Sequence, residues 1–362
     1  MLFQKTARSA TALFGFLMCL AFAAQAQNQA TAKLPNVTIL ATGGTIAGTG
    51  ATSTTTVGYT AATVGVQALI QAVPEMTKIA NVSGEQVFQI ASENMGNEHW
   101  LTLAKRVNTL LAQSNVDGIV ITHGTDTLEE TAYFLNLVVK SRKPVVVVGS
   151  MRPSTALSAD GPINLYNAVM LAGSQEAIGR GVLVSMNDQI NGARDVTKTN
   201  TTAADTFKTT ELGMLGYIVG GKPFFYRAST RKHTVDTEFD VMNLSTLPQV
   251  EIAYAHANVG PVAIEALVAS GAKGLVHAGV GDGSLPAKVR PALSAARKKG
   301  VIIVRSSRVG QGIVARNGEA NDDELDFVAG DNLSAQKARI LLMLALTRTT
   351  NTREIQNIFS TY

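Results

Sequence analysis

Two short stretches of the chain carry hydroxyl side chains to the ends of apolar, β-branched runs. The first stretch is Val37–Gly48, in which the apolar run stops at Thr42 and turns through two glycines to Thr45. In open α/β sheets, ligands bind beyond the carboxyl ends of the strands. We therefore interpret Thr45 as a nucleophile, whose hydroxyl the Gly-Gly turn lifts out of the sheet edge.

The second stretch is Gly118–Thr131, which reads GIVITHGTDTLEET. Its β-branched run ends in a His-Gly turn, followed by Thr125, Asp126 and a predicted helix that Thr127 can cap. Free N–H groups at a helix N-terminus suit an anionic ligand. A plain alternative is that Thr125 and Asp126 only cap this helix. The first stretch also places a threonine after a strand, so two strands would each bring a threonine to the same edge of one sheet. This coincidence favours a chemical role for Thr125 over simple capping.

A threonine hydroxyl is a weak nucleophile and needs a base. The segment Asp195–Thr199 reads DVTKT and lies beyond a predicted strand, Gly181–Met186. If its amine is partly desolvated and neutral, Lys198 can take a proton from Thr125. The alternative is that Lys198 is an ordinary solvated surface charge.

The segment 49–62 is rich in Thr, Ser and Gly and contains a single aromatic residue, Tyr59. Segments of this length without a clear structural pattern are often lids over a site. Tyr59 could therefore reach back over Thr45. The alternative is a surface tyrosine that packs the loop down.

Strand-like and helix-like patterns alternate along most of the chain, which predicts an α/β fold with a mainly parallel sheet covered on both faces. The predicted strands are Val87–Ala91, Gly118–Thr122, Val145–Val148, Gly181–Met186, Val250–Ala255, Gly274–Ala278 and Val301–Arg305. The predicted helices include Val64–Ala72, Trp100–Leu111, Thr127–Val139, Leu165–Ala172, Val262–Ala269, Lys288–Lys299 and Ala335–Leu346.

The region Phe224–Pro248 breaks this alternation, with mixed charges, aromatic residues and no clear period. We interpret it as a linker. The expected organisation is an N-terminal α/β domain over 34–223, which carries the two threonines, and a smaller α/β domain over 249–362.

The composition is that of a globular protein, with 46% hydrophobic and 16% charged residues among 362. Lys5 and Arg8 precede a short apolar run and an A-x-A pattern at 24–26, which predicts a signal peptide over 1–26 and export to the periplasm. The apolar run is too short to span a membrane. Of 31 basic residues, 29 remain after Lys5 and Arg8 are removed, against 27 acidic ones, so the net charge of +2 gives no reason to expect nucleic-acid binding.

Several other chemistries lack their sequence signatures. The chain has no Walker A motif, no G-x-G-x-x-G after a strand and no G-x-S-x-G elbow. Its only cysteine, Cys19, lies in the predicted signal peptide. The five histidines show no metal-ligand spacing: His99, His123, His233, His256 and His277. We expect no metal and no cofactor.

The motifs ATGGTIAG at Ala41–Gly48 and HGTDTLEET at His123–Thr131 resemble the signatures of bacterial type II asparaginases, and above all of the periplasmic glutaminase-asparaginases. The resemblance extends over about Leu34–Tyr362 and includes Ser306–Gly312 and Gln336–Leu346. It implies hydrolysis of the side-chain amides of L-glutamine and L-asparagine, with no cofactor.

The resemblance also implies roles for individual residues. Thr45 matches the nucleophile that forms an acyl-enzyme, and Tyr59 matches the lid tyrosine that helps to activate it. The residues that match the second threonine and its partners are Thr125, Asp126 and Lys198. Ser92 and Asp126 match the groups that hold the substrate's α-carboxylate and α-ammonium. Glu319 matches a glutamate given to the site by a neighbouring subunit, which implies a homotetramer with shared sites.

Two further positions concern the substrate range. Ser92-Glu93 is the form of members that accept both amino acids, whereas strict asparaginases tend to have Gln in the second position. Asp282 stands where many members have Asn, so that an extra carboxylate lies near the expected substrate ammonium. A non-catalytic periplasmic amino-acid binding protein is the alternative function, and a threonine amidase with another amide substrate is a third.

Overall fold

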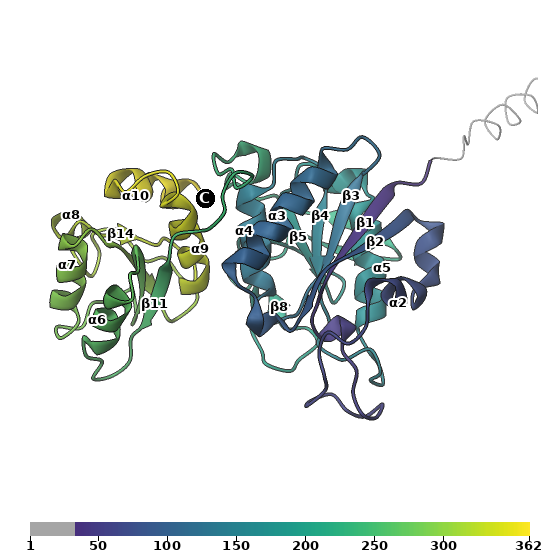
Figure 1. The fold of residues 1–362 in the computed structure, drawn as a ribbon, viewed down its shortest axis with the longest axis horizontal. Helices are drawn as coiled ribbons and strands as arrows, with labels where there is room; N and C mark the ends of the chain where they lie inside the picture. Colours follow the sequence, from purple (N-terminus) through teal and green to yellow (C-terminus); the bar gives the residue numbers. More distant parts are fainter. Residues whose placement is uncertain (1–32) are drawn as a thin grey trace, which may run out of the picture. The chain divides into compact units, whose positions relative to one another are not determined.

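The computed structural model describes residues 33–362, and the predicted signal peptide lies outside the described residues. Pro35–Tyr362 forms one compact unit that contains two main sheets and a separate two-stranded hairpin (Figure 1). The larger sheet has eight strands in the order β10-β9-β6-β5-β4-β3-β1-β2, and the smaller one has four in the order β11-β12-β13-β14. The expected α/β class is confirmed, with a mainly parallel larger sheet and a smaller parallel sheet.

The strands of the larger sheet are β1 (Asn36–Gly43), β2 (Asn81–Ile90), β3 (Gly118–Thr122), β4 (Val145–Val148), β5 (Val182–Met186), β6 (Gln189–Gly192), β9 (Gly216–Val219) and β10 (Lys222–Phe225). A separate hairpin pairs β7 (Thr197–Lys198) with β8 (Phe207–Lys208). The smaller sheet contains β11 (Val250–Tyr254), β12 (Gly274–Gly279), β13 (Ile302–Ser307) and β14 (Val328–Ala329). The α-helices are α2 (Val66–Gln71), α3 (Asn97–Leu111), α4 (Leu128–Val138), α5 (Gly161–Ala172), α6 (Val262–Ala269), α7 (Arg290–Lys298), α8 (Asp322–Leu325), α9 (Ala335–Ala345) and α10 (Thr352–Thr361).

The buried strands of the larger sheet divide their apolar side chains between two cores. Ile119 and Ile121 of β3 lie in the core beneath α3 and α4, while Val120 lies in the core beneath α2 and α5. Side chains alternate between the faces of a strand, so a strand that is covered on both sides must be apolar throughout. This is why the continuous β-branched runs predicted β3, β4 and β5 correctly.

Helix α9 connects the two sheets. It packs against β11, β12 and β13 on one side and against α4 on the other (Figure 1). The core beneath α3 and α4 therefore continues through α9 into the smaller sheet, where it includes Val276 and Val304. A second core of the smaller sheet lies beneath α6 and α7.

The sequence patterns missed the short strands β6 to β10, the two-residue strand β14 and the first half of β2. Strand β2 begins at Asn81, six residues before the predicted start, and pairs with β1 alone at the edge of the sheet. Its first residues are polar or half-exposed, because an edge strand buries less of its surface. Strand β10 lies partly in the segment predicted as a linker, since it runs from Lys222 to Phe225.

Candidate active site

The order of the strands brings three chain segments to one edge of the larger sheet. Strand β1 lies between β2 and β3 and is parallel to both. Their carboxyl ends are therefore neighbours, and each is followed by a hydroxyl residue: Thr45 after β1, Ser92 after β2 and Thr125 after β3. All three hydroxyl residues are buried.

Two glycine turns meet at this edge, backbone against backbone. A Cβ atom on Gly44 would lie 2.2 Å from both the Cα and the N of Gly124. A Cβ atom on Gly124 would lie 2.5 Å from Ser92 Oγ. These approaches are far shorter than a carbon contact allows, so only glycines let the three strand ends come this close.

Thr45 is hydrogen-bonded to the tyrosine of the Thr- and Gly-rich segment. Thr45 Oγ1 lies 2.7 Å from Tyr59 Oη, and Thr45 is only 6% exposed. The segment folds back over the turn through an antiparallel bridge between Thr49 and Thr60 and through a bond from the Ala62 N–H to the Gly44 carbonyl. The packing therefore brings Tyr59 over Thr45, as the lid interpretation expects.

Thr125 shares an amine with Asp126. Lys198 Nζ donates to Thr125 Oγ1 at 3.0 Å and to Asp126 Oδ1 at 2.6 Å. The N-cap position of α4 is Thr127, whose side chain makes no capping bond and donates instead to the carbonyl of Ser92. Neither Thr125 nor Asp126 is thus used to cap the helix, and Lys198 is not a free surface charge.

Ser92 joins the end of β2 to the Thr125 turn. Its Oγ accepts a hydrogen bond from the Asp126 N–H at 3.2 Å, and its carbonyl accepts the bond from Thr127. Glu93, the next residue, is exposed, and among residues 33–362 no hydrogen bond or ion pair of its side chain is present. Ser92 therefore belongs to the same constellation, whereas Glu93 lies at its exposed side.

A buried histidine holds the second turn. Trp100 Nε1–H donates to Thr131 Oγ1. The Gly124 carbonyl can only accept, so His123 Nδ1 carries a proton and donates to it at 2.7 Å. In a neutral His123, Nε2 then accepts the hydroxyl proton of Thr131 at 2.9 Å. Burial lowers the pKa of His123 to about 4, which agrees with a neutral ring. His123 thereby orients the peptide that packs against Gly44.

Asp282 and Glu319 lie together at the end of the smaller sheet. Asp282 Oδ1 accepts the Ala315 N–H at 2.8 Å, and the fully buried Arg305 donates to the carbonyls of Asp282 and Ala315. Glu319 is exposed on the same loop. In the described part of the chain, no hydrogen bond or ion pair joins Asp282 or Glu319 to the Thr45 or Thr125 group.

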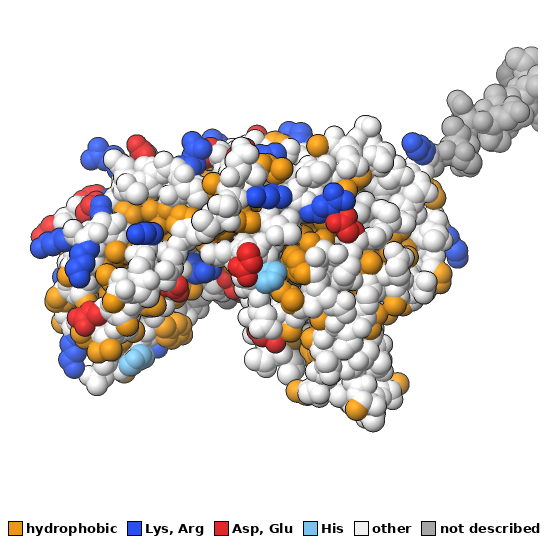
Figure 2. All heavy atoms as spheres, in the orientation of Figure 1, with side chains coloured by type: hydrophobic (Ala, Val, Ile, Leu, Met, Phe, Trp, Pro, Cys, Tyr) orange, Lys and Arg blue, Asp and Glu red, His pale blue; other side chains and the backbone are white. Residues whose placement is uncertain are grey.

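Residues 33–362 contain no group of three or more His, Cys, Asp or Glu side chains that could hold a metal ion. In the same residues no helix is both long and apolar enough to cross a bilayer. On the face shown in Figure 2, basic and acidic side chains are interspersed, so that face carries no patch of a single charge.

The fold and the site define an α/β enzyme in which three buried hydroxyl residues meet at the carboxyl edge of a parallel sheet. Residues 36–231 match the family described as "Asparaginase, N-terminal", and residues 249–359 match "Glutaminase/Asparaginase C-terminal domain". The chain belongs to the asparaginase family.

Curated relatives cover nearly the whole chain. It is 54% identical to the glutaminase-asparaginase of Pseudomonas fluorescens biotype A, over 96% of both chains. It is 53% identical to L-asparaginase 2 of Escherichia coli (strain K12), over 92% of this chain and 95% of the relative. Identity to L-asparaginase 2 of Bacillus subtilis (strain 168) is 56%, over 91% of this chain and 87% of the relative.

Two residues near the site were not singled out by the sequence patterns. His123 enters the sequence patterns only as part of the second turn and its motif and as a histidine without metal-ligand spacing, although a histidine between a buried strand and a glycine is itself a sign of a buried polar contact. Lys337 is buried within α9, and its signal was a lone lysine among the apolar residues of a predicted core helix.

Proposed function

We propose that this chain hydrolyses the side-chain amides of L-glutamine and L-asparagine, releasing ammonia and L-glutamate or L-aspartate through an ester on Thr45. The observation that carries the proposal is the hydrogen bond of 2.7 Å between Thr45 and Tyr59, at the sheet edge where Thr125 meets Lys198 and Asp126. The names of the relatives, glutaminase-asparaginase and L-asparaginase 2, support the substrate class.

In the first half of the reaction, Thr45 Oγ attacks the amide carbon and the C–N bond breaks. Tyr59 Oη takes the threonine proton and passes its own proton to the leaving nitrogen, which departs as ammonia. Because the phenol gains one proton and loses one, it returns to its starting state. The product on the enzyme is an ester of Thr45.

In the second half, a water oxygen bonds to the ester carbon and the bond to Thr45 Oγ breaks, so one proton must pass from the water to Thr45 Oγ. Once Lys198 has given a proton to Asp126, Thr125 can pass its own proton to Lys198 and take one from the water; Lys198 Nζ lies 3.0 Å from Thr125 Oγ1 and 2.6 Å from Asp126 Oδ1. Thr125 then gives a proton to Thr45 Oγ, and Asp126 and Lys198 pass theirs back, so that all three groups return to their starting state. Ser92 and Asp126 are the proposed contacts of the substrate's α-carboxylate and α-ammonium. Two such contacts would hold the amide carbon of the substrate next to the Thr45 hydroxyl. Positioning of this kind can by itself accelerate a reaction by several orders of magnitude.

Ammonia release from both amino acids tests the proposal. Thr45→Ala is expected to abolish it while the fold is kept. Thr49→Ala is the matched control, because the Thr49 hydroxyl bonds only to Thr63 and lies in the same segment. Full turnover in Thr45→Ala, or an adduct of a reactive amide analogue mapped to another side chain, would overturn the assignment.

We also propose that the working protein is an exported homotetramer, in which Glu319 reaches the site of a neighbouring subunit. Glu319 is exposed on a loop that Asp282 and Arg305 hold in place, which supports a role outside its own chain. A relative in Haemophilus influenzae is named as a probable periplasmic L-asparaginase, in line with export.

Mixing Glu319→Ala subunits with Thr45→Ala subunits tests the shared site. Some activity is expected to return, because a mixed oligomer can then assemble an intact site from two defective chains. If mixed oligomers form and no activity returns, the site is not shared.

A further inference from the structure

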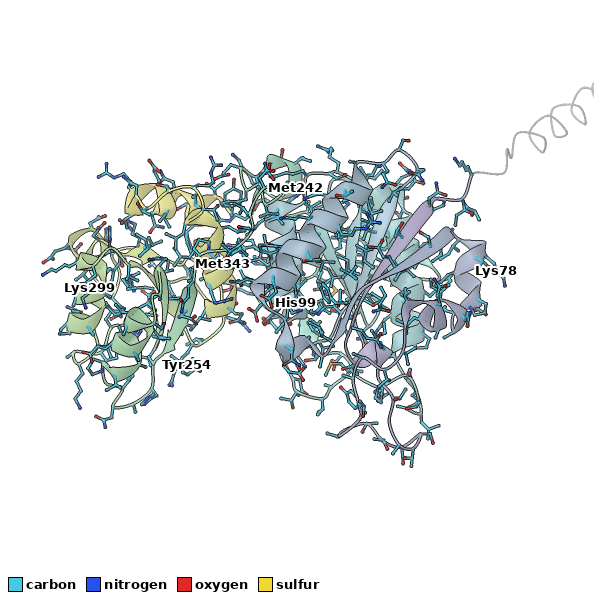
Figure 3. The ribbon with its side chains drawn as sticks, viewed as in Figure 1. Lys78, His99, Met242, Tyr254, Lys299 and Met343 are labelled. Atoms are coloured by element: carbon cyan, nitrogen blue, oxygen red, sulfur yellow. The ribbon has the colours of Figure 1, made fainter. Side chains whose placement is uncertain are left out.

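Lys337 is a buried ammonium group in a helix that otherwise packs through apolar side chains. It lies on α9, which is shown in Figure 3 with Met343 labelled, and only 3% of the residue is exposed. Its Nζ donates to two backbone carbonyls, that of Arg194 at 2.7 Å and that of Val196. Both acceptors lie outside the smaller sheet on which α9 packs.

The two carbonyls belong to the segment that leads from β6 to Lys198. Only Thr197 separates Val196 from Lys198, so a shift of the Val196 peptide must move Lys198 as well. The side chain of Arg194, in the same segment, makes a second connection, because it donates a hydrogen bond to Asp331 in the loop before α9. Helix α9 and its preceding loop thus hold the backbone from which the Lys198 amine extends.

A buried charge is a costly way to fill a core. Burial lowers the pKa of Lys337 to about 8, and the nearby charges of Glu129, Asp195 and Glu130 offset only part of the penalty. Without the Lys337 amine, the carbonyls of Arg194 and Val196 would lose this donor in the interior, and a buried acceptor without a donor is destabilising. The two hydrogen bonds of Lys337 therefore fix the position of these carbonyls.

We propose that Lys337 is a positioning residue of the reaction: by holding the Arg194 and Val196 carbonyls, it sets the distances from Lys198 Nζ to Thr125 and Asp126. The smaller sheet therefore takes part in building the site within one chain, through α9. This inference rests on the proposed function.

Lys337→Met tests the inference, because it keeps the length of the side chain and removes the donors. The matched control is Arg339→Met. Arg339 lies two residues later on the same helix and donates to the carbonyl of Val250 in β11, away from the Lys198 segment. Lys337→Met is expected to lower kcat about 10- to 100-fold with KM nearly unchanged, since a misplacement of 1 Å costs about that much. Arg339→Met is expected to keep kcat.

Two readouts separate positioning from a loss of stability. In Lys337→Met, hydrogen–deuterium exchange of the peptide containing residues 194–199 is expected to rise, and the pH profile of kcat is expected to shift. A lysine analogue at this position should restore the exchange and the pH profile of the wild type. To make it, Lys337→Cys is alkylated with 2-bromoethylamine in denaturant and then refolded. The wild type, treated in the same way, is the control. If Lys337→Met does not fold, Lys337→Gln, which keeps an uncharged NH₂ group on a shorter side chain, takes its place.

The outcomes are distinct. If the wild type releases ammonia and Lys337→Met matches Arg339→Met in kcat and in exchange, Lys337 does not position Lys198. If the wild type releases no ammonia from either amino acid, the proposed function fails, and the exchange of residues 194–199 alone decides whether Lys337 holds this segment.

Discussion

The contact between the two glycine turns leads to a sharp prediction for Gly44→Ala. Gly44 has φ +77° and ψ −169°, a region of backbone space that is essentially open only to glycine. Its added Cβ would also lie 2.2 Å from the backbone of Gly124, which cannot rotate away as a side chain can. The substitution must therefore strain its own peptide and push the two turns apart.

The expected cost has two parts. Holding a non-glycine residue in this conformation costs about 1–3 kcal/mol. Overpacking against a neighbour that cannot move costs about another 1–3 kcal/mol. The free energy of unfolding should fall by about 2–6 kcal/mol, a large part of the roughly 5–15 kcal/mol that stabilises a typical protein.

Gly220→Ala is the matched control. Gly220 also has a positive φ, +57°, but an added Cβ there would meet nothing within 4 Å. The free energy of unfolding of Gly220→Ala should therefore fall only by the conformational cost, about 1–2 kcal/mol. Urea unfolding of both variants and the wild type at one protein concentration gives the comparison, and kcat of Gly44→Ala should fall too. If Gly44→Ala loses no more stability than Gly220→Ala, the two turns are not in the close contact described here.

Three further predictions concern single side chains. Tyr59→Phe removes the hydroxyl that bonds to Thr45 and should lower kcat about 100-fold or more with little change in KM, which steady-state rates will reveal. Asp282→Asn keeps an acceptor for the Ala315 N–H, so its melting temperature should equal that of the wild type, whereas Asp282→Ala should melt at a lower temperature. Equal decreases in melting temperature for both variants would mean that the charge of Asp282 matters more than this bond. His123 has a pKa of about 4 in the folded chain against 6.5 unfolded, so its contribution to stability is present above pH 6.5 and lost as the pH falls through 4. Between pH 7 and 4.5 this loss lowers the free energy of unfolding of the wild type by about 2–3 kcal/mol. Urea unfolding of His123→Gln should not show this part of the pH dependence. The same pH dependence in both proteins would contradict a neutral, buried His123.

The local patterns of the sequence determined the parallel strands and the turns that follow them. Runs such as Gly118–Thr122 are apolar throughout because both faces of their sheet are covered, and the glycines that end them mark tight turns. The sequence could therefore predict the fold class and place Thr45 and Thr125 after strand ends. It could not predict β6, β9 and β10, because these strands are short and lie where the larger sheet turns antiparallel. Strands β7 and β8 are only two residues long each and form a separate hairpin, so they leave no period to read.

Only the tertiary structure decided which strand ends are neighbours and what each side chain touches. The order β2-β1-β3 brings Ser92, Thr45 and Thr125 together, and it depends on pairing between residues that are tens of positions apart. The hydrogen bond between Tyr59 and Thr45 and the bonds from Lys337 to the Lys198 segment depend in the same way on packing. Hydrophobic periodicity records which face of an element is buried but not which partner buries it. For this reason the sequence could not predict the Lys337 contacts, and it offered Tyr59 over Thr45 only as one of two interpretations.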